Sequence, residues 1–102
     1  MGRTSIIAKR IQQARERARI SSQAEVGILA GLHESGVSSR MNHYFKSRHE
    51  PKLPMMALIA AALHTPVPYF YCEDDTLAEL ILKWGTLNEE QKKRLLAFVD
   101  EL

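Results

Sequence analysis

The chain has 102 residues, enough for one compact domain with a modest core and too few for two ordinary domains. Apolar residues make up 45% and charged residues 25%, a balance that excludes a disordered chain. Cys72 is the single cysteine, which excludes an intramolecular disulfide and a cysteine-based zinc site. The N-terminal residues show no secretory signal, and the longest apolar run, residues 55–63, is too short to cross a membrane. We therefore expect a cytoplasmic protein.

Charge is distributed unevenly along the chain. Residues 1–52 carry ten basic and four acidic side chains, a net charge of +6, whereas residues 53–102 carry four basic and eight acidic side chains, a net charge of −4. A basic half beside an acidic half suggests that the first half faces a polyanion. Ordinary scatter of surface charge explains the same numbers. Charge alone therefore does not decide between a polyanion-binding surface and chance.

Apolar spacing predicts a first helix over residues 5–18, with Thr4 or Ser5 at its start. The stripe that supports this helix recurs every three or four residues and comprises Ile7, Ile11, Ala14 and Ala18. A second helix begins after Ser22, which forms a capping-box pattern with Glu25 three residues later. Gly31 then ends that helix, as a glycine just beyond a helix often does.

The next segments are also helical. A third helix covers residues 37–45, and its predicted core stripe consists of Val37, Met41, Tyr44 and Phe45. Pro54 suits the first turn of a fourth helix that ends near residue 63, and residues 69–71 form a short aromatic turn. Two further helices follow, over residues 75–84 and 88–102, the last with a capping box between Asn88 and Gln91. No stretch alternates with period two, so the sequence predicts an all-α fold.

The first half of the chain resembles a known family. Gln23, Gly27 and Gly31 stand where the Cro/CI-type (XRE, lambda-repressor-like) helix-turn-helix regulators have their glutamine, mid-helix small residue and turn glycine. Pro51 and the segment 67–70 resemble the region of the family's fourth and fifth helices. The turn after Gly31 is longer than usual and resembles a variant pattern made up of Glu34, Ser35, Ser38, Arg40, Met41, Asn42 and Tyr44.

This resemblance covers about residues 5–72 and implies a specific architecture. It predicts a five-helix lambda-repressor-like DNA-binding domain over residues 1–73, followed by a C-terminal helical hairpin over residues 74–102. The hairpin carries apolar stripes, Trp84 included, that must be buried against the DNA-binding domain, against a partner chain or against each other. Regulators of this type bind DNA as two-fold dimers, so we expect a homodimer, with the hairpin as a possible dimerisation segment.

In such a motif the second helix of the pair enters the major groove and reads bases mainly from its N-terminal part. We therefore expect base contacts from Ser38, Ser39, Arg40, His43 and Asn42, and phosphate contacts from Gln23, Lys46, Arg48 and Lys52. Each of these residues also has a simpler interpretation. The serines could instead cap the helix, and the charged side chains could be ordinary solvated surface groups.

Other kinds of site have little support. The spacing of His33, His43, His49 and Cys72 fits no usual zinc pattern, so we expect no metal. Residues 73–75 form an acidic cluster that a helix N-terminus explains without catalysis. The chain has neither a phosphate-binding loop nor a dinucleotide glycine pattern, so we expect no cofactor and no enzymatic activity. No site for a small-molecule ligand is apparent.

These observations predict a sequence-specific regulator that binds double-stranded DNA, of the bacterial or phage repressor type. Two alternatives remain open. The chain could be a DNA-binding antitoxin that holds a toxin through residues 75–102, or a protein-interaction module that keeps the fold without reading DNA.

Overall fold

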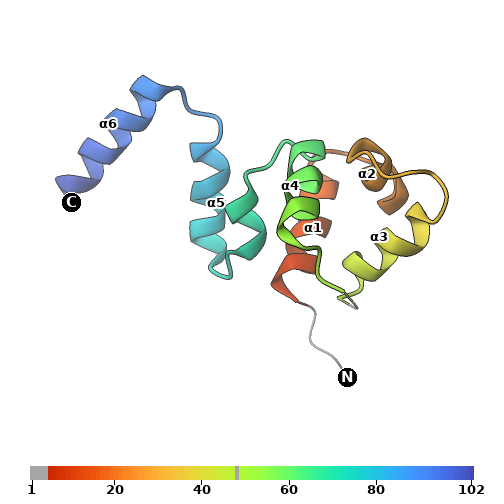
Figure 1. The fold of residues 1–102 in the computed structure, drawn as a ribbon. Helices are drawn as coiled ribbons and strands as arrows, with labels where there is room; N and C mark the ends of the chain where they lie inside the picture. Colours follow the sequence, from red (N-terminus) through yellow and green to blue (C-terminus); the bar gives the residue numbers. More distant parts are fainter. Residues whose placement is uncertain (1–4, 48) are drawn as a thin grey trace.

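A computed structural model describes residues 5–47 and 49–102, and these residues form six α-helices and one short 3-10 helix without any strand (Figure 1). The elements in chain order are α1 (Ile6–Arg17), α2 (Gln23–Leu29), α3 (Val37–Phe45), α4 (Leu53–Ala62), η1 (Val67–Tyr71), α5 (Asp75–Trp84) and α6 (Glu89–Asp100). The predicted all-α class is confirmed. None of the described helices is long and apolar enough to cross a bilayer.

Polar side chains start several helices where the sequence predicts. Ser5 caps α1, and Ser22 caps α2 by accepting a 3.1 Å hydrogen bond from the Glu25 backbone N–H. The capping box predicted at Ser22 is only half formed, because the hydrogen bonds of the described residues include no return bond from the Glu25 side chain. Asn88 and Gln91 complete both bonds of their box at the start of α6. Each bonded cap satisfies a backbone donor that the helix itself leaves unpaired.

Helix α2 ends in a left-handed residue, as predicted. Gly31 has φ +94°, and the Leu32 N–H donates to the carbonyl of Gly27 over 2.9 Å, which is the Schellman arrangement. Arg19 after α1 and His64 after α4 also have positive φ and end their helices with the same bonding pattern. These sharp ends let α1 to α4 fold back on one another.

The core lies between α1, α2, α3, α4 and η1 (Figure 1). Its largest fully buried side chains are Phe70, Ile11, Met41, Met56, Ile59 and Val26. The core predictions for α3 are confirmed, since Val37, Met41 and Tyr44 are buried and Phe45 packs partly buried against them. The core therefore holds α3 by one face and leaves its opposite face to solvent.

Helix α5 packs on this core through Ala78, which is 1% exposed, with Ile81 and Leu82 partly buried beside it. Helix α6 follows after a short turn and contains no buried residue. In Figure 1 it diverges from α5 and extends away from the other helices. The expected C-terminal hairpin is therefore open in this structure.

Candidate nucleic-acid interface

Helices α2 and α3 form the most extensive helix–helix contact of the molecule. The contact is close because Gly27 of α2 has no side chain. A Cβ atom at Gly27 would lie 2.7 Å from Met41 Cγ and closer still to Val37 Cγ2. This approach fixes α3 against α2, which is the packing that a helix-turn-helix pair requires.

The N-terminal part of α3 is free of side-chain caps. Gly36 is the N-cap residue, with φ +79°, and no side chain accepts a hydrogen bond from the first turn. Ser38, Ser39 and Arg40 are exposed there. The alternative that the two serines serve as helix caps is therefore wrong. The first turn presents small polar groups and an arginine to solvent, a surface that can approach another molecule closely.

An open hollow of about 620 Å³ lies between the start of α2 and α3. It is lined by Arg15, Ser21, Ser22, Gln23, Ala24, Ser38, Ser39 and Asn42. The structure thus brings the predicted phosphate residue Gln23 beside three of the predicted base-reading residues. Most of the lining residues carry a hydroxyl or an amide group, and these groups hydrogen-bond to water, phosphate and base edges alike.

Arg15 is a member of this hollow that sequence reasoning missed. Its Nη1 donates to the carbonyl of Ile20 over 2.8 Å, and its Nε lies 3.5 Å from Gln12 Oε1. These bonds hold the guanidinium at the junction of α1 and α2. From the sequence, Arg15 could be recognised only as one of the basic residues of the first half. Its position beside Gln23 depends on how α1 packs against α2.

A second hollow of about 420 Å³ lies between α3 and the start of α4. Its lining comprises Arg40, His43, Tyr44, His49, Glu50, Lys52 and Met55. The Nε of Arg40 donates to Tyr44 Oη over 3.1 Å, so the guanidinium lies along α3. Lys52 stands here as the N-cap residue of α4. The structure therefore brings together two predicted base-reading residues, Arg40 and His43, with the predicted phosphate residue Lys52.

His43 is half-buried, and its ring centroid lies 5.3 Å from that of His49. Within the part of the chain that the structure describes, the buried Nδ1 of His43 has no hydrogen-bond partner. Buried polar atoms are nearly always hydrogen-bonded in folded proteins, so this nitrogen is an exception in the described chain.

The remaining predicted contacts lie apart from these hollows or outside the described residues. Lys46 is exposed and is the C-cap residue of α3, but it lines neither hollow. Arg48, which we also expect to contact phosphate, lies outside the described residues.

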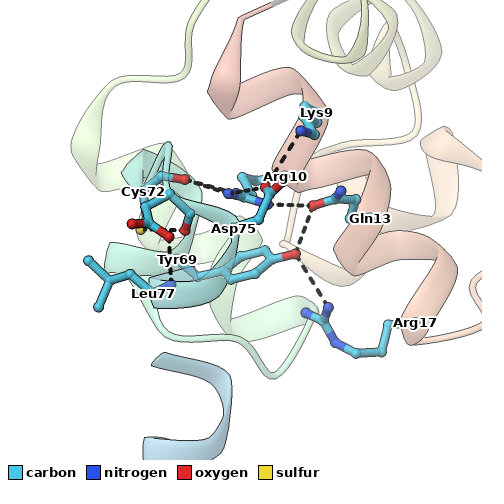
Figure 2. Close-up of polar contacts among 9 residues, drawn as sticks. Lys9, Arg10, Gln13, Arg17, Tyr69, Cys72, Asp75 and Leu77 are labelled. Carbon is cyan, nitrogen blue, oxygen red and sulfur yellow. Dashed lines mark hydrogen bonds and ion pairs between the residues drawn. The ribbon is translucent and has the colours of Figure 1, made fainter. Parts of the chain in front are cut away.

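Not every basic residue of the first half faces solvent, which corrects the simplest interpretation of the charge asymmetry. Arg10 is 2% exposed and lies inside the fold. Its Nε and Nη2 donate to the carbonyl of Cys72 over 2.9 and 2.8 Å, and its Nη1 donates to Gln13 Oε1 (Figure 2). The Nη2 atom also lies 2.9 Å from Asp75 Oδ1. Arg10 thus attaches the segment after η1 to α1 rather than contacting a polyanion.

The acidic cluster at residues 73–75 has a structural role in the same region. Asp74 caps α5 through a 3.0 Å bond from the Leu77 N–H, and Asp75 pairs with Arg10 and Lys9 (Figure 2). The hydrogen bond from Arg10, with the positive charges of Lys9 and Arg10, lowers the pKa of Asp75.

Arg17 stacks on Tyr69, with its guanidinium carbon 5.0 Å from the ring centroid. Among residues 5–47 and 49–102, no three His, Cys, Asp or Glu side chains cluster as metal ligands would.

The structure is similar to one that has been solved. It matches a crystal structure of the transcriptional regulator BswR with a TM-score of 0.83 and 42% sequence identity, over 93% of each chain. No protein-family model matches the chain, and the comparison with curated proteins finds no match. The coverage includes both the helical core and most of the C-terminal region, so the similarity extends over nearly the whole chain.

Proposed function

The chain belongs to the same family as the transcriptional regulator BswR, and from this premise we propose that it is a sequence-specific regulator of transcription that binds double-stranded DNA. The proposal includes a lambda-repressor-like, Cro/CI-type domain over residues 1–73, with α2 and α3 as its helix-turn-helix. The chain acts by binding: occupation of an operator blocks the polymerase, as a repressor does. No catalytic step is involved.

One observation carries this proposal. Helix α3 is packed on α2 through Gly27, and its uncapped N-terminal part exposes Ser38 and Ser39 at one open hollow and Arg40 at a second. An α-helix fits the major groove of B-DNA, and its exposed side chains reach base edges there. A helix held by one face, with polar side chains on the other, is therefore suited to enter that groove.

The residues take two roles in this proposal. Arg40 reads guanine through a bidentate pair, and Ser38, Ser39, Asn42 and His43 contact neighbouring base edges. Gln23, Lys46, Arg48 and Lys52 hold the phosphate backbone, and we add Arg15 to this group because it lines the same hollow as Gln23. For Arg40 to reach a base, its bond to Tyr44 must break or rearrange.

The protein binds as a homodimer on an inverted repeat, and residues 74–102 supply the contact between the two copies. Two-fold regulators of this type place their reading helices about one DNA turn apart.

The test is selection of bound sequences from a random duplex pool by the purified protein and by Arg40→Ala. We expect enrichment of an inverted repeat by the wild type and loss of one base preference per half-site in the variant, with a cost of about 1–3 kcal/mol in specific affinity. Lys9→Ala, which removes an exposed cation on α1 that lines neither hollow, is the matched control and should leave the preference unchanged.

Equal preferences for the wild type and Arg40→Ala would remove the role given to Arg40. A folded protein that enriches no sequence would contradict DNA reading altogether and favour an interaction module. An antitoxin would enrich an inverted repeat and also bind a toxin through residues 75–102.

A further inference from the structure

Two histidine rings lie beside each other on the surface that we propose for DNA. The ring centroids of His43 and His49 are 5.3 Å apart, and the ring planes are tilted by 55°. His43 belongs to α3 and His49 to the loop that leads to α4, and the His49 backbone N–H donates to the His43 carbonyl over 3.4 Å. Histidine is the side chain that changes charge between about pH 5 and 8. The pair is therefore a titratable cluster on this surface.

The two rings share their hollow with other charged groups. Besides the histidines, its charged or titratable lining residues are Arg40, Tyr44, Glu50 and Lys52. Lys46 follows His43 by three residues on the same helix, and Arg48 lies outside the described residues. Positive neighbours oppose a further positive charge on the rings, whereas Glu50 favours one. These opposite influences partly offset one another in the free protein.

The short distance between the rings favours a single proton on the pair. Two imidazolium charges this close repel each other, so a second proton is harder to add than the first. His49 is exposed, whereas His43 is half-buried and its Nδ1 has no hydrogen-bond partner among the described residues. A charge on the exposed ring loses less hydration, so His49 is the ring that carries the proton.

We propose that DNA binding is linked to the uptake of a proton by the His43–His49 pair, so that the affinity for DNA rises as the pH falls. This inference rests on the proposed function, in which Lys52 contacts a phosphate, because His49 lines the same hollow as Lys52. A phosphate bound there adds a negative charge close to the ring and stabilises its protonated form. The complex then holds more protons than the separate molecules do, and by linkage binding is stronger at lower pH.

A histidine elsewhere in the chain provides a matched control. His64 is exposed after the end of α4 and lines a different hollow, together with Arg17 and Leu82 among others. It does not line the hollow that holds Arg40 and Lys52. Replacing His64 therefore removes a titratable imidazole without changing the surface that we propose for DNA.

The experiment measures how pH changes the affinity of the full-length protein for DNA. Fluorescence anisotropy gives the Kd for a labelled mixed-sequence duplex of about three helical turns, at one low salt concentration, between about pH 5.5 and 7.5. A mixed sequence suffices because phosphate contacts do not depend on the bases. The wild type is compared with His49→Gln, with the double variant His43→Gln and His49→Gln, and with the control His64→Gln. Circular dichroism at both ends of the pH range verifies that each protein keeps its helix content.

We expect the wild type to bind about fivefold more tightly at the low end of this pH range than at the high end, the effect of one charge pair near the protein surface. His49→Gln and the double variant should lose most of this dependence, and His64→Gln should keep it. Glutamine stays polar but cannot change charge, so the loss reports titration rather than a missing hydrogen bond. Calorimetry in two buffers that differ in their enthalpy of ionisation counts the protons directly, and the wild type should take up a fraction of one proton at about pH 6.5.

The outcomes separate this inference from the proposed function. A wild-type affinity that stays constant across the pH range, or a pH dependence that His49→Gln retains, would overturn the proton uptake and leave DNA binding intact. Failure to bind any duplex at any pH would contradict the proposed function, and the proton uptake would fall with it. Proton uptake on mixed-sequence DNA by a protein that enriches no sequence in the selection would support the linkage and remove sequence-specific reading.

Discussion

Helices α1 and α6 each contain 12 residues, and each carries an apolar stripe at helical spacing, yet they differ completely in burial. Helix α1 buries Ile7, Ala8, Arg10, Ile11 and Ala14, whereas α6 buries no residue at all. Both begin with a side-chain cap, so local sequence specifies the two helices equally well. The difference teaches that an apolar stripe predicts a helix with a contact face, while the rest of the chain decides whether that face is covered internally.

The comparison is sharpest for two phenylalanines. Phe70 is 0% exposed and Phe98 is 59% exposed. We expect Phe70→Ala to lower the free energy of unfolding by about 3–5 kcal/mol, because it leaves a large cavity in the core. Phe98→Ala should change the stability of the monomer by less than about 0.5 kcal/mol. Urea unfolding at protein concentrations where dimers are absent measures the free energy of unfolding of both variants. Similar losses in the two variants would contradict the claim that the core covers Phe70 and leaves Phe98 uncovered.

Arg10 tests whether a buried polar side chain contributes as much to the free energy of unfolding as a buried apolar one. Arg10→Ala removes the donors to the Cys72 carbonyl and the contact with Asp75, and it opens space beside Tyr69. We expect a loss of about 3 kcal/mol in the free energy of unfolding. The control is Lys9→Ala, which removes only the exposed partner of Asp75 and should have a much smaller effect. Equal effects would show that Arg10 acts only as a surface charge.

Gly27 tests the packing of α3. A Cβ atom at this position meets Val37 and Met41, so we expect Gly27→Ala to cost about 2 kcal/mol of unfolding free energy. Val37→Ala in the same chain should recover part of that loss, because it removes the nearer of the two obstructing side chains. A double-mutant cycle by chemical denaturation checks this coupling, and strictly additive losses would place the strain elsewhere.

The smallest expected effect concerns pH. Because Arg10 and Lys9 lower the pKa of Asp75 in the folded protein, Asp75 contributes stability at pH values above its ordinary pKa of about 3.9. That contribution is lost as the pH falls through the lowered pKa of the folded state. Asp75→Asn should therefore flatten part of the pH dependence of unfolding below about pH 4. Identical pH profiles for the two proteins would contradict the pairing.

Local chemistry allowed much of the fold to be predicted from the sequence. Ser5, Ser22, Asn88 and Gly31 act within a few residues of where they stand, so the helix boundaries could be found without the structure. The internal position of Arg10 could not be found in this way. Its acceptor, the Cys72 carbonyl, lies 62 residues further along the chain.

The candidate site likewise has one part that the sequence predicts and one part that only the structure shows. The exposed start of α3 follows from its apolar spacing, which assigns Val37, Met41 and Tyr44 to the core and Arg40 to solvent. The hollow that joins Arg15 to Gln23 depends on how α1, α2 and α3 pack together, so it required the structure. The roles of these residues in binding DNA stay predictions until the selection is done.

The short turn between α5 and α6 has a consequence for evolution. Arg10 and Ala78 hold α5 against the core, while α6 is joined to α5 through residues 85–88, where Gly85 lies close against Pro66, and through the contact of Lys92 with the Trp84 ring. In the proposed dimer, the course of these four residues therefore determines how far apart, and at what angle, the two α3 helices stand. A substitution in this turn could adapt a descendant to a differently spaced operator while every base-reading side chain stays the same.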